Sequence, residues 1–366
     1  MKIIGAVLEG IGYPTPYRQS LPLRVGELDV DAPGLGEVLV RVEAAGLCHS
    51  DLSVINGSRI RPTPMLLGHE AVARIEEVGD EVGDFGVGDR VVLTFMPRCG
   101  SCVGCITEGV RPCVEGTATN TAGTLLGGHI RLHQDHTPVF HHLGVSAFAT
   151  HAVVNTRSLV KVPEDIPSDV AAVLGCAVLT GGGAIINVAK PSKGSTVVIV
   201  GLGGVGIAAA LTALAHDGVE VIAVETAPSK LALASKLGID VMTPDEILAA
   251  GHKAGNVVDA TGVAAALETA VSLTEAGGQT ISVGLPAPDT LISISPTSLV
   301  AEGRSLIGSY LGSAVPARDI PIFIDMWRRG TLPLETMISH HVDLHDINAA
   351  MDSLSRAETL RQIITF

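Results

Sequence analysis

Hydrophobic and polar residues follow two different patterns along the chain, and the change falls near residue 177. Beyond it, short and almost wholly apolar runs alternate with stretches of helical composition. The apolar runs are VVIV at 197–200, VEVIAV at 219–224, NVVDA at 256–260 and QTISVG at 279–284. Strands inside a parallel sheet are buried on both faces and read as continuous apolar runs. We therefore predict βαβ units and a parallel sheet, with helices ending at Ala215, spanning 228–237 and ending at Thr274.

The first half of the chain has a different texture. Short β-rich stretches are separated there by glycine and proline, and they cover residues 38–42, 71–78, 90–93 and 152–154. This spacing is typical of irregular, mostly β structure. With 366 residues, the chain is long enough for two domains of ordinary size.

Two long runs contain no charged residue, Val170 to Ala189 and Gly194 to Ala215. Each is long enough to cross a bilayer, and the mean hydropathy of +0.42 also leans toward a membrane protein. Glycines interrupt both runs, however, and aromatic residues make up only 3% of the chain, too few for interfacial belts. We therefore expect burial inside a protein and no membrane span.

Charge narrows the range of partners. The net charge is −14, and no cluster of lysine and arginine occurs anywhere. Nucleic acid and anionic membrane surfaces are therefore excluded as expected partners. The first ten residues contain Glu9 and two glycines where a signal peptide would be apolar, so we expect no export and a cytoplasmic location.

Four of the six cysteines, Cys99, Cys102, Cys105 and Cys113, lie close together in one loop rich in glycine and proline. Four thiolates at this spacing fit one tetrahedral zinc ion and leave no position for a substrate, so such a site is structural. Two disulfides, unrelated thiols and an iron–sulfur cluster are the alternatives. We expect a structural zinc whose loss unfolds at least this lobe.

The remaining cysteines, Cys48 and Cys176, are far apart and sit in distinctive segments. These segments are GLCHSD at 46–51 and GCAVLTG at 175–181, with GHE at 68–70 between them. Two cysteines and one histidine fill three zinc positions and leave the fourth open, which is the pattern of a catalytic zinc. Considered alone, Cys176 is more typical of a packed core residue.

A glycine-rich turn directly follows the apolar run at 197–200. Its residues are Gly201, Gly203, Gly204, Val205 and Gly206. With a strand before it, a helix after it and Glu225 closing the next strand, the turn forms a dinucleotide-binding fingerprint. Glu225 is expected to bind the adenosine ribose and to repel a 2′-phosphate, which favours NAD over NADP.

Together these segments occur in the order and spacing of zinc-dependent alcohol dehydrogenases of the medium-chain dehydrogenase/reductase family, which the chain resembles from end to end. The resemblance implies an α/β protein with a GroES-like, mostly β catalytic domain and a Rossmann domain with a doubly wound parallel sheet. The catalytic domain would cover 1–177 and 311–366, and the NAD-binding domain 178–310. It also implies two zinc ions per chain and a homo-oligomer, with a dimer favoured.

The resemblance also assigns roles to single residues. Cys48, His69 and Cys176 match the ligands of the catalytic zinc, and Glu70 lies behind the metal. Asp51 matches a carboxylate that fixes the tautomer of the zinc-bound histidine, and Ser50 matches the hydroxyl that takes the substrate proton. Among the positions that match coenzyme contacts, Lys230 matches a residue on the adenosine ribose and Arg361 a pyrophosphate contact. Val283 and Leu285 match the region that lines the nicotinamide. His49 lies where a pyrophosphate-binding arginine is common and is expected to contact phosphate, to relay protons, or both. The positions that match the substrate pocket are Ser50, Phe95, Phe148 and Leu285.

The implied activity is the reversible oxidation of primary and secondary alcohols, aromatic and terpenoid ones included, by hydride transfer from a zinc-bound alkoxide to NAD. The small-molecule partners would be the alcohol and its aldehyde or ketone. Two positions depart from the family pattern: Ser53 replaces a relay histidine, and Thr117 replaces the arginine that binds glutathione in formaldehyde dehydrogenases of the family. The alternatives are such a thiol-adduct formaldehyde dehydrogenase, a zinc-free quinone-type reductase and a non-enzymatic scaffold that binds zinc and nucleotide.

Overall fold

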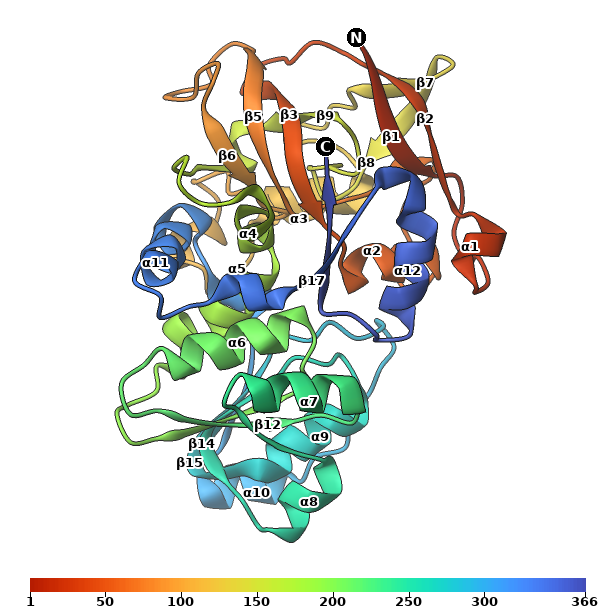
Figure 1. Cartoon of the computed structure of the whole chain (residues 1–366). Helices are drawn as coiled ribbons and strands as arrows, with labels where there is room; N and C mark the ends of the chain where they lie inside the picture. Colours follow the sequence, from red (N-terminus) through yellow and green to blue (C-terminus); the bar gives the residue numbers. More distant parts are fainter. The chain divides into compact units, whose positions relative to one another are not determined.

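The computed structural model describes residues 1–366, and these residues form two compact units. Unit 1 comprises Met1–Cys176 and Ile338–Phe366, and unit 2 comprises Ala177–Met337. Figure 1 labels many of the elements of both units. Unit 1 is mostly β and unit 2 is built on a parallel sheet, as the sequence pattern predicted.

Unit 1 contains a closed barrel of five strands in the order β1-β2-β7-β8-β4 and a seven-stranded sheet in the order β10-β6-β5-β3-β18-β17, in which β9 also pairs with β3. Its strands are β1 (Lys2–Leu8), β2 (Leu23–Val30), β3 (Glu37–Gly46), β4 (Met65–Leu66), β5 (Ala71–Val78), β6 (Arg90–Leu93), β7 (Leu132–Gln134), β8 (Thr137–His141), β9 (His151–Asn155), β10 (Leu159–Lys161), β17 (Ile338–Val342) and β18 (Arg361–Thr365). The four stretches predicted as β in this half are thus confirmed as parts of β3, β5, β6 and β9.

The helices of unit 1 are short. They are α1 (Tyr17–Ser20), α2 (His49–Ile55), α3 (Val114–Ala122), α4 (Ser168–Ala172) and α12 (Ile347–Ser355), with 3₁₀ turns at Cys105–Thr107, Thr156–Ser158, Val173–Gly175 and Leu344–Asp346. The C-terminal strand β18 pairs antiparallel with the end of β3, Ile363 opposite Gly46. The last residues of the chain therefore lie beside the strand that leads into Cys48.

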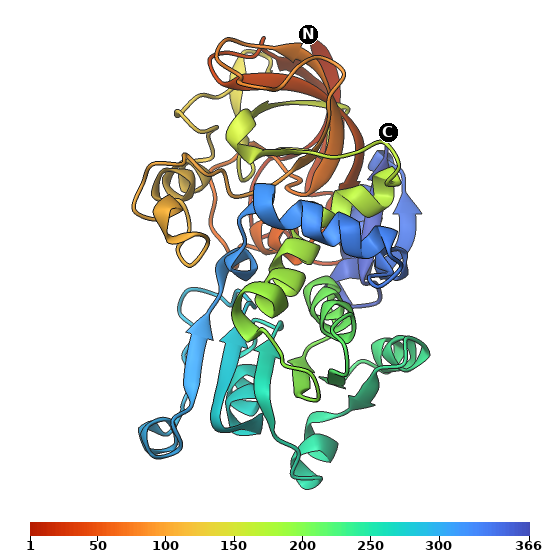
Figure 2. The same cartoon turned by 90° about the vertical axis from the view of Figure 1, so that its left-hand side faces the viewer.

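Unit 2 has six strands, all parallel, in the order β13-β12-β11-β14-β15-β16. They are β11 (Thr196–Val200), β12 (Glu220–Val224), β13 (Asp240–Met242), β14 (Ala254–Asp259), β15 (Thr274–Ser282) and β16 (Ser305–Gly308). Figure 2 shows the teal, cyan and blue strands β14, β15 and β16 side by side and running in the same direction. The four strands predicted for this half are confirmed as parts of β11, β12, β14 and β15, and most of their apolar side chains are buried, as the pattern of a parallel sheet predicts.

Helices precede, connect and follow these strands in unit 2. They are α5 (Ala177–Gly183), α6 (Gly204–Leu214), α7 (Pro228–Lys236), α8 (Pro244–Ala249), α9 (Ala264–Leu273), α10 (Pro296–Glu302) and α11 (Pro316–Arg328), with a π-helix at Ala184–Ala189 and 3₁₀ turns at Tyr310–Ser313 and Leu334–Met337. The predicted helices correspond to α6, α7 and α9.

The second boundary between the units differs from the sequence expectation. Residues 311–337 were expected in the catalytic domain, whereas in the structure they belong to the compact unit 2. The reason is packing. Helices α5 and α11 pack so closely that a Cβ atom added to Gly182 in α5 would lie only 2.6 Å from the ring of Phe323 in α11. Asn187 also donates to Asp319 at 3.0 Å, which ties α11 to the π-helix.

No single helix of the chain combines the length and the apolar composition needed to span a membrane. One bent pair, Ser168–Gly175 with Ala177–Ala189, passes that test by length and composition only. It covers the first of the two charge-free runs, whose residues are largely buried in the protein.

Candidate functional site

Three segments of unit 1 bring Cys48, His69 and Cys176 together. Cys48 follows β3 and is the N-cap of α2. His69 follows β4 by three residues, and Cys176 follows the 3₁₀ turn at Val173–Gly175. Their ligand atoms all lie within 4.8 Å of one another, and all three residues are buried.

This cluster fits a metal ion. His69 is fully buried, and its Nε2 atom has no hydrogen-bond partner in the protein. A buried nitrogen without a partner costs free energy unless something else binds it. Two sulfurs and one nitrogen are ligands that zinc prefers, and they leave a fourth tetrahedral position open.

The charges around the cluster favour a thiolate at Cys48. The hydrogen bond from the Cys176 thiol, together with the nearby charges of Arg361 and His69, lowers the pKa of Cys48 well below its usual value. The same hydrogen bond and burial raise the pKa of Cys176. Thiolates are the form in which cysteine binds metals, so the direction of this pKa shift favours Cys48 as a metal ligand.

Asp51 holds His69 in place. The Asp51 carboxylate is fully buried and accepts hydrogen bonds from Gly68 N and His69 Nδ1, both at 3.1 Å, and from Cys48 N at 3.2 Å. Burial alone would raise the pKa of Asp51, but the charges and hydrogen bonds of His69 and His142 lower it to about 2. The anionic carboxylate keeps the proton of His69 on Nδ1 and leaves Nε2 as the metal-binding atom.

Glu70 and Arg361 form a buried ion pair in unit 1. Arg361 Nε lies 3.1 Å from Glu70 Oε1, and Arg361 Nη1 donates to the carbonyl of Leu47 at 3.2 Å. Only 2% of Arg361 is exposed. The resemblance assigned Arg361 to the coenzyme pyrophosphate; that role stays a prediction, and the structure adds Glu70 as its partner.

Ser50 lies next to the cluster, with its hydroxyl 3.9 Å from the Cys48 sulfur. Ser53, at the position of the missing relay histidine, donates to the Ser50 carbonyl at 2.9 Å. His49 is exposed at the first position of α2.

The two predicted pocket aromatics differ in their surroundings. Phe95 packs edge-on against His69, with the ring centroids 5.7 Å apart, so it borders the metal cluster. Phe148 is fully buried within the hydrophobic core of unit 1. Its place in the substrate pocket remains a prediction.

The second cluster consists of the four cysteines predicted for a structural zinc. All are free thiols, which rules out the two disulfides considered as an alternative. The sulfurs of Cys99 and Cys105 are 3.9 Å apart, and those of Cys102 and Cys113 are 3.8 Å apart. A tetrahedron with zinc–sulfur bonds of about 2.3 Å has sulfurs about 3.8 Å apart, so the four cysteines fit this geometry.

Backbone groups also favour thiolates in this loop. The N–H groups of Val114 and Cys105 donate to the Cys102 sulfur, both at 3.4 Å, and they lower the pKa of Cys102 to about 6. Gly116 N donates to the Cys113 sulfur at 3.3 Å, although burial raises the pKa of Cys113 on balance. The loop therefore supplies hydrogen-bond donors suited to a metal-bound sulfur.

The glycine-rich turn lies in unit 2, between β11 and α6. Gly201 has a φ of +90°, which glycine adopts without strain. A Cβ atom on Gly206 would overlap the carbonyl oxygen of Gly201, whereas one on Gly203 would meet nothing within 4 Å. The turn is therefore tightly closed on one side and has free space at Gly203, as a pyrophosphate at a helix N-terminus requires.

Glu225 follows β12 and reaches this turn. Its carboxylate accepts hydrogen bonds from the backbone N–H groups of Leu202 at 2.9 Å, Thr226 at 2.7 Å and Ala227 at 3.0 Å. Burial alone would raise the pKa of Glu225, but these donors lower it. Lys230 Nζ lies 3.8 Å from the same carboxylate. Two predicted ribose contacts are thus neighbours at the mouth of the turn.

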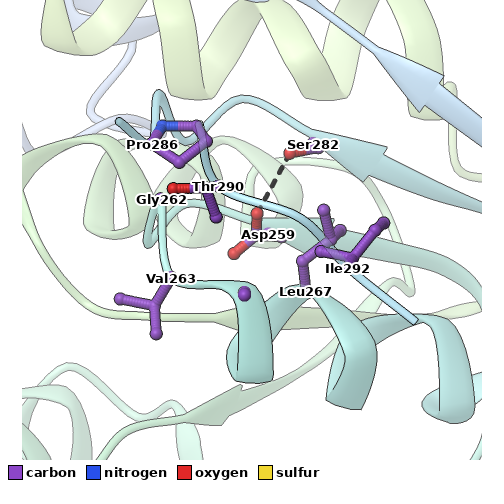
Figure 3. A pocket seen from close by; sticks show the side chains of 9 residues that line it. Asp259, Gly262, Val263, Leu267, Ser282, Pro286, Thr290 and Ile292 are labelled. Carbon is purple, nitrogen blue, oxygen red and sulfur yellow. Dashed lines mark hydrogen bonds between the residues drawn. The ribbon is translucent and has the colours of Figure 1, made fainter. Parts of the chain in front are cut away.

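A cavity of about 160 Å³ lies at the carboxyl ends of β14 and β15 (Figure 3). Asp259 is at its wall, where it accepts from Ser282 Oγ at 3.0 Å and from Thr261 Oγ1 at 2.6 Å. Val283 donates its N–H to the Asp259 carbonyl at 2.9 Å, and Leu285 is 54% exposed. The two positions predicted to line the nicotinamide thus follow β15 at this edge of the sheet.

Sequence reasoning missed His142. Its Nδ1 lies 3.1 Å from Asp51 Oδ1, and its ring stands edge-on to His69. It belongs to no motif, and the only signal would have been the strand pairing that brings β8 beside β4.

Comparisons with known proteins agree with this picture. Residues 34–164 match the family model of the alcohol dehydrogenase GroES-like domain, and residues 204–328 match that of the zinc-binding dehydrogenases. Together the two models cover more than half of the chain.

Individual relatives extend over nearly the whole length. Alcohol dehydrogenase 1 of Petunia hybrida is 33% identical over 358 residues, covering 94% of each chain. S-(hydroxymethyl)glutathione dehydrogenase of Synechocystis sp. is 30% identical over 357 residues, covering 94% of this chain and 96% of its own. The crystal structure of benzyl alcohol dehydrogenase from Acinetobacter calcoaceticus aligns with a TM-score of 0.90 and 30% identity, covering 100% of this chain and 99% of its own. The chain therefore belongs to the zinc-type alcohol dehydrogenases of the medium-chain dehydrogenase/reductase family.

Proposed function

We propose that the protein is an NAD-dependent alcohol dehydrogenase that interconverts primary or secondary alcohols with aldehydes or ketones. The observation that carries the proposal is the buried cluster of Cys48, His69 and Cys176, with an unpartnered His69 nitrogen and one position left for a substrate oxygen. When bound there, zinc would act as a Lewis acid that lowers the pKa of the alcohol hydroxyl. A second zinc, held by the four cysteines of residues 99–113, would be structural.

In this proposal, each residue around the cluster has a separate role. Asp51 keeps His69 in the tautomer that presents Nε2. Ser50, whose hydroxyl lies 3.9 Å from the Cys48 sulfur, would take the proton of the alcohol. Phe95 supplies an apolar wall against His69, which excludes water from the reacting group. In this proposal Glu70 and Arg361 are charged groups behind the ligands.

NAD is proposed as the hydride acceptor, with its pyrophosphate on the turn Gly201–Gly206 and its adenosine ribose at Glu225. NAD would supply the oxidising power. The support for NAD over NADP is electrostatic: backbone donors keep Glu225 anionic. An anion at this place accepts the hydroxyls of an unmodified ribose and repels a 2′-phosphate.

A glutathione adduct is the second candidate substrate, since one relative is named for that activity. Thr117 argues against it. Its hydroxyl donates to the Cys113 carbonyl at 2.8 Å, and it offers no cation for a glutathione carboxylate. We therefore propose simple and aromatic alcohols as the substrate class. The expected cytoplasmic location and dimer remain predictions.

The test is a screen of the zinc-loaded protein with NAD and with NADP over primary, secondary, aromatic and terpenoid alcohols and S-hydroxymethylglutathione. We expect turnover of simple or aromatic alcohols, with a kcat/KM above that for the glutathione adduct and a preference for NAD. The variant Glu225→Gln keeps the shape without the charge, so its preference for NAD should shrink.

Two outcomes would overturn parts of the proposal. A higher kcat/KM for S-hydroxymethylglutathione than for every free alcohol would make the protein a thiol-adduct dehydrogenase. Zinc-loaded protein that binds NAD but oxidises none of these substrates would support the non-enzymatic scaffold.

A further inference from the structure

His142 is a buried histidine that the ligand set does not use. Only 1% of the residue is exposed, and it directly follows β8. Strand β8 pairs in parallel with β4, with Leu66 opposite His141. Because β4 leads into Gly68 and His69, this register brings His142 next to the metal-binding histidine.

The backbone of His142 is fixed from several sides. Its N–H contacts the hydroxyl of Ser146 at 2.9 Å and the carbonyl of Leu66 at 3.3 Å. Its carbonyl accepts the N–H groups of Val145 at 3.1 Å and Ser146 at 3.3 Å. The side chain of His142 is therefore presented from a closed turn that is anchored to β4.

From this turn the imidazole reaches the carboxylate that orients His69. His142 Nδ1 lies 3.1 Å from Asp51 Oδ1, the oxygen that also accepts from His69 Nδ1 and Gly68 N. The two histidine rings stand nearly perpendicular, with centroids 5.4 Å apart and an interplanar angle of 88°. The His142 contact lies within ion-pair distance but does not have the geometry of a hydrogen bond, and Nδ1 of His142 is buried without a hydrogen-bond partner.

The chemistry of the groups decides where the proton of His142 lies. A carboxylate oxygen only accepts hydrogen bonds, and a neutral imidazole has one N–H and one bare nitrogen. At 3.1 Å the contact with Asp51 is attractive only if Nδ1 of His142 carries its proton. Both histidines then present an Nδ1–H group to the same oxygen.

We propose that His142 is a positioning residue of the metal centre: it anchors the Asp51 carboxylate, which in turn holds His69 in the orientation that metal binding requires. The inference rests on the proposed metal site at Cys48, His69 and Cys176. Groups that orient a ligand from outside the metal's own coordination shell change metal affinity by about 10- to 100-fold. His142 acts one residue further away, so its effect should lie near the lower limit.

Two variants of equal shape separate the hydrogen-bond donor from the packing. Asn and Leu have the same side-chain branching, but only Asn carries an N–H near the position of the histidine Nδ1. Both side chains are smaller than histidine, so His142→Asn and His142→Leu leave similar space. The difference between them reports the effect of a polar donor facing Asp51 at nearly constant side-chain shape.

The measurement is competition for zinc between the protein and a chromophoric chelator. The Cys48→Ala variant lacks a ligand of the proposed site, so the zinc that this variant fails to bind is the zinc held by Cys48, His69 and Cys176. The zinc held by the four cysteines of residues 99–113 serves as an internal control. We expect His142→Leu to bind this metal about tenfold more weakly than the wild type. His142→Asn should recover most of the affinity. With Co²⁺ in place of zinc, the absorption bands should shift in the Leu variant and return in the Asn variant.

Equal affinities for the Leu and Asn variants, or a Leu variant that binds as tightly as the wild type, would overturn the inference. The metal content of the wild type tests the proposed centre itself. Wild-type protein with no metal at Cys48, His69 and Cys176 would therefore refute the proposed function rather than the role of His142.

Discussion

The carboxylate of Asp51 accepts the Nδ1–H of His69 at 3.1 Å, and neither side chain is exposed to solvent. This hydrogen bond determines which nitrogen of His69 is available. Nε2 is left buried and unpartnered, within 4.8 Å of the sulfurs of Cys48 and Cys176. The chemistry proposed for the protein depends on this relationship.

The first prediction concerns Asp51. The variant Asp51→Asn keeps the shape but offers His69 a weaker, neutral acceptor, and its amide N–H₂ faces a backbone donor. Metal affinity at the Cys48 site should fall about 10- to 100-fold. Zinc per chain after dialysis against a chelator series measures the loss, and the four-cysteine zinc should be retained. Unchanged retention at both sites would contradict the role of Asp51.

A second prediction concerns the buried pair of Glu70 and Arg361. Arg361→Met keeps the unbranched apolar stem of the side chain but removes the guanidinium, which leaves the Glu70 carboxylate buried without its cation. Breaking a buried ion pair from one side costs about 3–5 kcal/mol. Urea unfolding of Arg361→Met should show a loss of this size, and the double variant with Glu70→Gln should lose less than the sum of the single variants. A loss below about 1 kcal/mol would speak against the pair.

The glycine-rich turn offers a matched pair of variants. A methyl group on Gly206 would overlap the Gly201 carbonyl, whereas one on Gly203 would enter free space. We expect Gly206→Ala to lower the melting temperature and to lose NAD binding. Gly203→Ala should keep its melting temperature and bind NAD more weakly, because the new methyl group occupies the proposed phosphate position. Fluorescence titration with NADH checks this, and full NADH affinity in Gly203→Ala would contradict the assignment.

The free energy of unfolding should depend on pH because the pKa of His141 is lower in the folded protein than in the unfolded chain. Burial lowers the pKa of His141 to about 3, from 6.5 for an ordinary histidine. Between about pH 3 and pH 6.5, His141 is therefore protonated in the unfolded chain but neutral in the folded protein. The stabilisation is complete above pH 6.5 and is lost as the pH falls toward 3, by up to about 1.4 kcal/mol per pH unit.

Between pH 7.5 and pH 5 this amounts to about 2 kcal/mol. The matched control is His141→Gln, which does not titrate and can still accept the N–H of Arg131 that His141 Nε2 now accepts at 3.1 Å. Urea unfolding at the two pH values should show the extra loss in the wild type only. The same loss in both proteins would contradict the assignment to His141.

Local patterns identified most of the fold. Strands β11, β12, β14 and β15 were predictable because each is an apolar run between turn signals, and the turn at Gly201–Gly206 because it lies between a strand and a helix. The four-cysteine cluster was predictable from its spacing alone. These features share one property: the residues that define them are close together in sequence.

Features that depend on distant packing were not predictable. The contact of Phe323 with Gly182 moves the second unit boundary from residue 311 to 338, and no local pattern encodes it. His142 reaches Asp51 only because β8 pairs with β4. Arg361 was matched to a phosphate by resemblance, and only the pairing of β18 with β3 reveals Glu70 as its neighbour.

The most direct test of the account is NADH formation from an alcohol by Cys48→Ala, compared with the wild type at equal NAD and saturating zinc. Removal of one ligand should abolish the metal's contribution of several kcal/mol, so turnover should fall about 1000-fold or more. The variant should keep its melting temperature and its four-cysteine zinc. Undiminished alcohol oxidation by a folded Cys48→Ala protein would contradict the central claim that Cys48, His69 and Cys176 form the catalytic metal centre.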